Sequence, residues 1–123
     1  MSISVLAIDD SRTIRALVSQ ALGNAGFKVT TAEDGVDGVA TFEKGAFDAV
    51  ITDINMPRMD GFGVIENIRK SGKNRRVPIL VLTTESGQDL RTRARNSGAT
   101  GWIVKPFVDE QLVSVLRRVT GAA

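Results

Sequence analysis

The chain has 123 residues, of which 42% are hydrophobic and 24% are charged, and its formal net charge at pH 7 is +2. This length predicts one domain around one hydrophobic core. Cysteine and histidine are both absent, which excludes disulfides, zinc sites built on thiolates or imidazoles, and Ser-His catalytic triads. No apolar stretch reaches the roughly 20 residues of a membrane-spanning helix, and the N-terminus lacks the pattern of a secretory signal. We therefore expect a cytoplasmic protein without a membrane partner.

The first strand and helix are predicted near the N-terminus. The run 3–8 (ISVLAI) is apolar enough for a buried strand and leads directly into Asp9 and Asp10. Ser11 is suited to cap the helix that follows, because its side-chain oxygen can accept a hydrogen bond from a free backbone N–H. Apolar residues at helical spacing then continue this helix to about Gly26. They are Ile14, Leu17, Val18, Ala21 and Leu22.

Two further strands enclose a short helix. Residues 27–32 predict the second strand, and residues 47–52 predict the third, which leads into Asp53. Between them lies the second helix. Its apolar residues are Val36, Val39 and Ala40.

The next segment predicts a central strand between two helices. Ile65 and Ile68 mark the third helix. Residues 78–82 (PILVL) form an almost purely apolar run, as expected of a central strand that is covered on both faces. The fourth helix, over residues 87–97, is mostly polar. Its apolar stripe consists only of Leu90 and Ala94.

The fifth strand and the fifth helix complete the pattern. Residues 100–104 predict the strand. The helix has Asp109 and Glu110 at its start and Arg117 and Arg118 near its end, which matches the helix dipole. Its expected buried residues are Val108, Leu112, Val115, Leu116 and Val119.

Strands and helices thus alternate five times along the chain. Such alternation predicts right-handed crossovers and an α/β fold, in which a doubly wound, five-stranded parallel sheet lies between two layers of helices. No linker, repeat or low-complexity segment interrupts the pattern. We therefore expect a single domain over residues 1–123.

Reactive side chains follow four of the predicted strands. Asp9 and Asp10 follow the first strand, Asp53 the third, Thr83 the fourth and Lys105 the fifth. In a parallel α/β sheet all strands end at the same edge, and this edge is where ligands bind. The sequence therefore predicts one site with three carboxylates, a hydroxyl and an ammonium.

The three carboxylates indicate a bound cation. Two carboxylates about 4 Å apart repel by roughly 4 kcal/mol at an effective dielectric constant near 20. Oxygen ligands without histidine or cysteine suit a hard ion, and Mg2+, which keeps several waters, fits best. With the ion bound, one carboxylate can attack a phosphorus atom while Mg2+ and Lys105 neutralise the developing charge. Thr83 would donate a hydrogen bond to a phosphoryl oxygen.

The motifs at this edge resemble the receiver domains of two-component response regulators. They are Asp9-Asp10, Asp53 followed by Met56-Pro57 and Asp60-Gly61, Thr83, and Lys105-Pro106-Phe107. The resemblance covers essentially the whole chain and points to stand-alone receivers of the chemotaxis CheY type. It implies a flavodoxin-like, CheY-like fold with the strand order 2-1-3-4-5, an order for which CheY itself is a standard example.

The resemblance also implies a role for each site residue. Asp53 is the phosphoacceptor, Asp10 binds Mg2+ directly, and Asp9 acts through water. The backbone carbonyl of Asn55 completes the metal ligands that the protein provides. Lys105 pairs with the phosphoryl group, and the peptide bond between Lys105 and the following proline is cis.

A switch is implied by the same resemblance. Phosphorylation draws Thr83 inward, and an aromatic side chain three residues before the lysine moves into the vacated space. That residue is Trp102, which is bulkier than the expected Tyr or Phe. Thr84 replaces the small residue common after the switch threonine and can narrow access to the site, whereas Asn55 and Glu85 are candidates for tuning hydrolysis of the phosphoryl group.

Three other classes of function fit the sequence less well. An aspartate-nucleophile phosphatase of the haloacid dehalogenase type needs a second carboxylate two residues after the nucleophile, where this chain has Asn55. A flavodoxin-like FMN carrier needs a phosphate-binding first loop, and Asp9 and Asp10 would repel the phosphate. The basic second half of the chain suggests nucleic acid, but no reading helix is evident, so we expect no nucleic-acid partner.

The resemblance further implies the partners. A chemotaxis-type histidine kinase is the phosphodonor, and the flagellar motor switch protein or another regulator is the target. A single-domain phosphorelay intermediate and a phosphate sink fit nearly as well. We expect a monomer whose partner face binds an amphipathic segment bearing acidic residues. The residues expected on this face are Leu90, Arg91, Arg95 and Trp102.

Overall fold

Strands and helices alternate along the chain, as predicted, in a computed structural model that describes residues 2–121. The strands are β1 (Ser4–Ile8), β2 (Lys28–Ala32), β3 (Ala49–Thr52), β4 (Ile79–Thr83) and β5 (Gly101–Val104). The helices are α1 (Arg12–Asn24), α2 (Gly35–Lys44), α3 (Gly61–Lys70), α4 (Gln88–Ser97) and α5 (Asp109–Thr120). Each strand begins one or two residues later than predicted. Phe47, for example, precedes β3 and stacks on Phe42 with ring centroids 6.3 Å apart.

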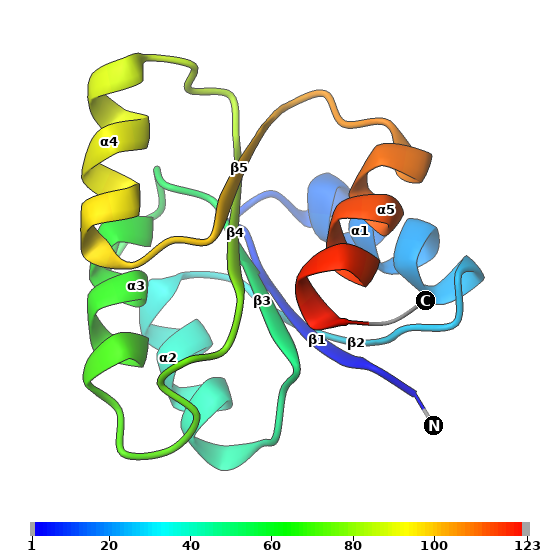
Figure 1. Ribbon diagram of the computed structural model, residues 1–123, viewed down its shortest axis with the longest axis horizontal. Coiled ribbons are helices and arrows are strands. Elements are labelled where there is room, and N and C mark those ends of the chain that lie inside the picture. Colours follow the sequence, from blue (N-terminus) through cyan, green and yellow to red (C-terminus); the bar gives the residue numbers. More distant parts are fainter. Residues whose placement is uncertain (1, 122–123) are drawn as a thin grey trace.

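The five strands form one parallel sheet in the order β2-β1-β3-β4-β5. This order confirms the one that the resemblance implies. Figure 1 shows the sheet nearly edge-on, with α1 and α5 covering one face and α2, α3 and α4 covering the other. Because all strands are parallel, all of them deliver their carboxyl ends to the same edge.

The hydrophobic core is divided into two clusters by the sheet. Successive side chains of a strand point to opposite faces, so in β1 Leu6 belongs to the cluster beneath α2, α3 and α4, while Val5 and Ala7 belong to the cluster beneath α1 and α5. Every residue of β3 and β4 is buried, as the apolar run 78–82 predicts for a central strand. The sheet is therefore a rigid platform for residues that follow its strands.

The predicted cap of the first helix is confirmed. Ser11 Oγ accepts a hydrogen bond of 3.2 Å from the backbone N–H of Ile14. This cap starts α1 immediately after Asp9 and Asp10, so the chain turns away from the sheet just beyond the two acids. Among the described residues, no helix is long and apolar enough to cross a membrane.

One expectation about burial is wrong. Val108 is 59% exposed, because it is the extended residue before the first turn of α5 and lies outside its apolar stripe. Leu17 is 46% exposed, because α1 turns a narrower stripe toward the sheet than its apolar residues suggest. That stripe consists of Val18, Ala21 and Leu22. In α5, Leu112 and Leu116 are buried, and Val115 and Val119 are only partly buried.

Candidate functional site

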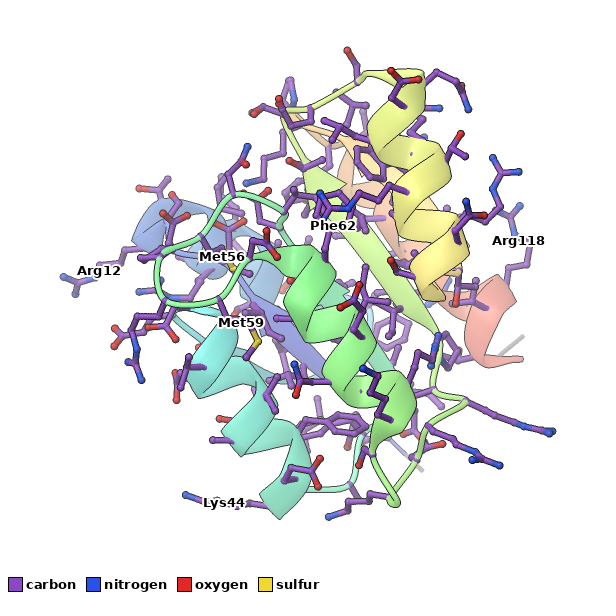
Figure 2. All side chains as sticks on the ribbon, turned by 90° about the vertical axis from the view of Figure 1, so that its left-hand side faces the viewer. Arg12, Lys44, Met56, Met59, Phe62 and Arg118 are labelled. Carbon is purple, nitrogen blue, oxygen red and sulfur yellow. The ribbon has the colours of Figure 1, made fainter. Side chains whose placement is uncertain are left out.

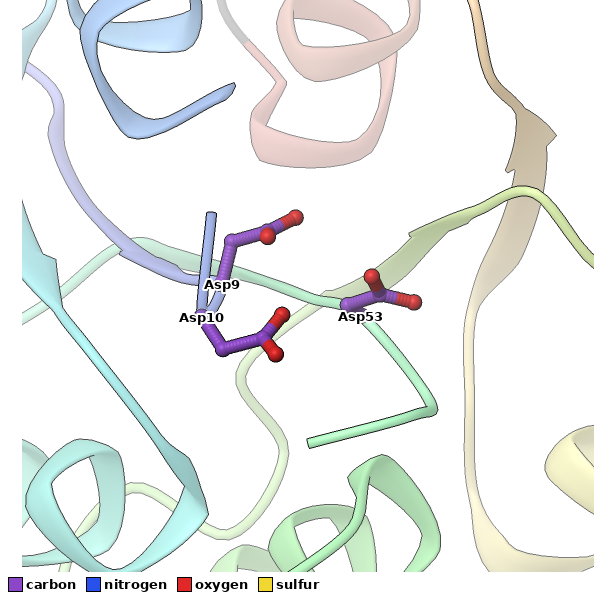
Figure 3. A group of neighbouring side chains, drawn as sticks. All are labelled: Asp9, Asp10 and Asp53. Carbon is purple, nitrogen blue, oxygen red and sulfur yellow. The ribbon is translucent and has the colours of Figure 1, made fainter. Parts of the chain in front are cut away.

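Three carboxylates meet at the edge of the sheet where the strands end (Figure 3). Asp9 and Asp10 follow β1, and Asp53 follows β3, the neighbouring strand. The register pairs the last residues of these two strands, so the residues that follow them are adjacent. One oxygen from each carboxylate lies within 4.8 Å of the others. Asp9 and Asp53 are buried, whereas Asp10 is exposed.

Lys105 reaches this cluster from the end of β5. Its ammonium donates hydrogen bonds of 2.8 Å to Asp9 Oδ2 and to Asp53 Oδ2. Burial acts to lower the pKa of Lys105, but the hydrogen bonds to Asp53 and Asp9 together with the negative charges of these acids outweigh it, and the pKa lies above the usual value. The side chain is therefore charged at neutral pH and compensates two of the three carboxylates.

The surroundings of Asp9 disfavour its charged form. Burial raises the pKa of its carboxyl, although hydrogen bonds from Lys105 and from the backbone N–H of Ser11 oppose the rise. Arg15 donates a hydrogen bond of 2.8 Å to the backbone carbonyl of Asp9, so the residue is held firmly in place. A cation at this position would favour the ionised carboxylate.

Asp53 is oriented by the backbone around it. Its Oδ1 accepts a hydrogen bond of 2.6 Å from the N–H of Ile54, and its own N–H donates to the carbonyl of Ile8 at 3.0 Å. With Oδ2 bound to Lys105, both oxygens of the carboxylate have defined partners. A side chain held this firmly is suited to a reaction that depends on the direction of attack.

Thr83 lies at the same edge but does not bind the carboxylates. Its side chain is fully buried at the end of β4, and its Oγ1 accepts a long hydrogen bond of 3.4 Å from the backbone N–H of Glu85. The backbone N–H of Lys105 donates to the carbonyl of Thr83 at 2.8 Å. Thr83 and Lys105 are therefore neighbours, and the hydroxyl has a partner that is easily replaced.

Trp102 is linked to the loop that follows Thr83. Its indole N–H donates a hydrogen bond of 3.0 Å to the carbonyl of Glu85, and its ring, only partly buried, packs against the core cluster beneath α4. Thr84 is exposed in this loop. The loop is thus held on one side by the Thr83 hydroxyl and on the other by Trp102. The peptide bond between Lys105 and Pro106 is cis, as the resemblance implies.

A groove runs along the predicted partner face. Its volume is about 260 Å3. The lining residues are Arg91, Ala94, Arg95, Ala99, Thr100, Gly101 and Trp102. Leu90 does not line the groove and packs against the core instead. The Nε of Arg91 is buried and has no hydrogen-bond partner in the described part of the chain.

Arg93 differs from its two neighbours on α4. Its guanidinium lies 3.8 Å from the ring centroid of Phe62, at the start of α3, and Figure 2 shows this phenylalanine between α3 and α4. Arg93 is therefore a packing contact between the two helices. Of the three arginines of α4 (Arg91, Arg93 and Arg95), only Arg91 and Arg95 line the groove.

Sequence reasoning missed an ion pair beside the site. Arg58 Nη1 lies 3.2 Å from Asp34 Oδ2, and Arg58 has a φ of 69°. No sequence signal announces this conformation, because left-handed backbone favours Gly, Asn or Asp over arginine. Arg69 was missed as well. It donates hydrogen bonds to the carbonyls of Val77 and Gly98 and is structural.

The donor set fits Mg2+. Three carboxylates offer only oxygen ligands, and the exposed Asp10 leaves room for the waters that Mg2+ keeps. The Asp53 oxygen that faces Lys105 shows that this position already accommodates a positive charge. The residues that would hold the ion are Asp9, Asp10, Asp53 and the backbone carbonyl of Asn55.

We expect Asp10→Asn to weaken Mg2+ binding by roughly tenfold or more, because the exposed carboxylate would be lost as a charged ligand while the fold stays intact. Isothermal titration calorimetry measures the Kd directly. Glu66→Gln removes one negative charge from an exposed position on α3 and should leave the Kd within about twofold. An unchanged Kd in Asp10→Asn would remove this residue from the metal site.

Comparison with known proteins agrees with the fold. The response regulator receiver domain family matches residues 5–117. The chemotaxis protein CheY-3 of Vibrio cholerae is 35% identical over 119 residues, which is 96% of this chain and 92% of that protein. The probable chemotaxis protein CheY of Rhizobium etli is 36% identical over 121 residues, 98% of this chain and 94% of that protein.

Solved structures are similar over the same length. The chemotaxis protein CheY4 of Vibrio cholerae has a TM-score of 0.92 and 44% identity, and the match covers 97% of this chain and 99% of that chain. The receiver domain of a sensor histidine kinase from Pseudomonas aeruginosa has a TM-score of 0.91 and 29% identity, covering 98% and 99%. In that structure a magnesium ion is coordinated in the active-site cleft.

The doubly wound sheet and the acidic site at its carboxyl edge place the chain among α/β proteins of the CheY-like class. More narrowly, the chain belongs to the response regulator receiver domain family. Receiver domains are phosphoacceptors that bind Mg2+ in an acidic site, and the acidic cluster is present here. Membership also implies a histidine kinase as phosphodonor and a downstream target.

Proposed function

We propose that the chain accepts a phosphoryl group on Asp53 from a histidine kinase, in a reaction that depends on Mg2+. The observation that carries this proposal is the Lys105 ammonium, which binds both Asp53 and Asp9 at 2.8 Å within a cluster of three carboxylates. A structural ion pair needs one acid for one base. Two additional acids are explained by a site that binds a cation and a phosphoryl group together.

In the proposed reaction, a carboxylate oxygen of Asp53 forms a bond to phosphorus. The bond between phosphorus and the imidazole nitrogen of the donor breaks, and its electron pair stays on that nitrogen. Lys105 transfers a hydrogen bond from the carboxylate to a phosphoryl oxygen. Mg2+ would neutralise part of the phosphoryl charge, and the residues that would hold it are Asp9, Asp10, Asp53 and the backbone carbonyl of Asn55.

The chain is then a phosphoacceptor with self-catalysed phosphorylation and dephosphorylation, and it has no separate substrate to turn over. Three side chains around the cluster can tune hydrolysis. Asn55 and Thr84 are exposed, and Glu85 is half-buried. We propose that all three contact water that approaches Asp53. Thr84 carries a branched side chain, which narrows this approach and lengthens the life of the phosphorylated state.

The proposed output is a shift of the loop after β4. A phosphoryl oxygen would replace the Glu85 amide as the partner of the Thr83 hydroxyl, whose present hydrogen bond is 3.4 Å long. Because Trp102 holds the Glu85 carbonyl, a move of this loop changes the position of the indole. The helix that follows is easily displaced, since Ala94 is the one buried residue of α4.

The partner face is proposed to bind an amphipathic segment with acidic residues. Arg91 and Arg95 line the groove next to Trp102, and their two positive charges favour a segment that carries carboxylates. The similar proteins from Vibrio cholerae and Rhizobium etli are described as chemotaxis proteins. We infer that the target is the flagellar motor switch, and that the protein is a cytoplasmic monomer with no nucleic-acid partner.

Swimming behaviour tests the chemotactic role. Deleting the gene should remove changes of swimming direction, and the wild-type gene should restore them. A gene with Asp53→Asn should not restore them, although the protein accumulates normally. If deletion leaves swimming unchanged, the motor role is wrong, and a phosphorelay intermediate or a phosphate sink becomes the better function. Transfer of a radiolabelled phosphoryl group from Asp53 to a second histidine-containing protein would then indicate a phosphorelay intermediate, and no onward transfer would indicate a phosphate sink.

A further inference from the structure

Arg58 has an unusual backbone for its residue type. Its φ is 69°, and it is the one residue other than glycine with a positive φ in the described part of the chain. It lies in the loop between β3 and α3, three residues after Asn55. A left-handed arginine is strained, and it persists only where the surrounding structure holds it. The contacts of Arg58 therefore show which part of the protein fixes the position of this loop.

That environment is a buried carboxylate at the start of α2. Asp34 Oδ2 lies 3.2 Å from Arg58 Nη1, and its side chain is only 6% exposed. Asp34 Oδ1 accepts a hydrogen bond of 2.8 Å from the N–H of Asp37 and caps α2. Both oxygens are thus used. The arginine side chain itself is 59% exposed, so the pair contributes little to overall stability.

The ion pair joins two segments that lie beside the metal site: the segment after β2, which contacts Asp9, and the loop that carries Asn55. On one side, Asp34 follows β2, and the last carbonyl of that strand, Ala32, accepts a hydrogen bond of 3.1 Å from the N–H of Asp9. On the other side, Arg58 belongs to the loop that carries Asn55. This loop is closed at its base by a hydrogen bond of 2.8 Å between the Gly61 N–H and the Ile54 carbonyl.

Close packing reinforces the connection. A Cβ added to Gly35 would lie 2.2 Å from the carbonyl oxygen of Met59, so the first turn of α2 and the loop touch backbone to backbone. Figure 2 shows the Met59 side chain between α2 and α3. The loop is therefore held by its base, by Met59 and by the Arg58–Asp34 pair.

We propose that Arg58 and Asp34 are positioning residues for the metal site. Their ion pair holds the loop so that the Asn55 carbonyl stays at a fixed distance from Asp9 and Asp10. Mg2+ requires nearly ideal octahedral geometry with short bonds, so an Asn55 carbonyl that moves freely loses much of its value as a ligand. This inference rests on the Mg2+ site of the proposed function.

Arg58→Asn provides the decisive test. Asparagine tolerates the left-handed backbone but cannot reach Asp34. We expect the Kd for Mg2+, measured by calorimetry, to rise roughly tenfold, while the Tm without metal stays within about 3 °C of the wild type. Simple electrostatics predicts the opposite, because removing a positive charge near a cation site tightens cation binding. A higher Kd for Mg2+ in Arg58→Asn would therefore indicate that the residue positions the loop, whereas a lower Kd would indicate that only its charge matters.

Matched variants complete the test. Arg58→Lys keeps the charge at Asp34 and should retain most of the affinity. Arg75→Asn removes an exposed arginine from the loop between α3 and β4 and should leave the Kd unchanged. In an Asp34→Asn background, which keeps the helix cap, adding Arg58→Asn should have no further effect.

Two results would overturn the inference. One is a Kd in Arg58→Asn that equals or lies below the wild-type value. The other is an equal effect of Arg58→Asn in the presence and absence of the Asp34 carboxylate. A wild-type protein that does not bind Mg2+ would instead contradict the proposed metal site itself, so the two failures can be told apart.

Discussion

Asp53→Asn is expected to abolish phosphorylation. Incubation of the wild-type protein with Mg2+ and acetyl phosphate should add one base-labile phosphoryl group, because an acyl phosphate is cleaved by hydroxide. The asparagine variant keeps the shape of the side chain but has no anionic oxygen to attack phosphorus, so no label above background should appear. Intact-mass spectrometry before and after mild base measures the modification. A base-labile label that persists in the variant would falsify the assignment of Asp53.

Trp102 allows the same substitution to be followed without labelling, since it is the only tryptophan in the chain. Beryllofluoride with Mg2+ mimics the phosphoryl group and should change the wild-type emission through the loop that joins Thr83 to Trp102. Asp53→Asn should show no change. Asp89→Asn, at an exposed position on α4, should respond like the wild type. A wild-type emission that ignores the mimic would mean that Trp102 is a passive packing residue.

Lys105→Met is expected to lower the free energy of unfolding by about 3 kcal/mol in the absence of Mg2+. The lysine is the shared partner of two buried carboxylates, at 2.8 Å from each, and methionine fills its volume without a charge. Urea unfolding at pH 7 measures the loss. Added Mg2+ should recover part of it, because the ion binds the folded acids only.

The loss of unfolding free energy in Lys105→Met should depend on pH. The folded-state pKa of Lys105 is raised, so its contribution is complete below the usual value of 10.5 and is lost as the pH rises through the folded pKa. The pKa of Asp9 is raised by burial, so its protonation favours the folded state. The deficit of Lys105→Met should therefore shrink as the pH falls and Asp9 takes up a proton.

Two variants control for the lysine substitution. Lys105→Arg keeps a positive charge and should lose less stability than the methionine variant. Lys73→Met alters an exposed lysine at the opposite edge of the sheet and should cost less than about 1 kcal/mol. If Lys105→Met is as stable as the wild type at pH 7, the ammonium does not hold the buried acids in solution.

The layout of the fold and the place of the site could be predicted from the sequence. Runs such as residues 78–82 predict buried strands through local composition, and Ser11 predicts a helix start through the chemistry of one hydroxyl. Once the strands are parallel, Asp9, Asp53 and Lys105 must meet at one edge, because each follows a strand. The strands, the helix start and the position of the site all follow from short-range sequence patterns, and the structure agrees with these predictions.

Other features were decided only by the tertiary structure. The two hydrogen bonds of Lys105 join residues 96 and 52 positions apart, and no local pattern determines which acids a long side chain reaches. Leu17 is exposed because α1 turns only a narrow stripe toward the sheet, and Val108 is exposed because it precedes the first turn of α5. The left-handed Arg58 and its pairing with Asp34 likewise depend on the tertiary structure, since an arginine adopts that backbone only where packing from α2 and the loop requires it. The sequence by itself thus determines which residues reach the site, while long-range packing determines which atoms they bind.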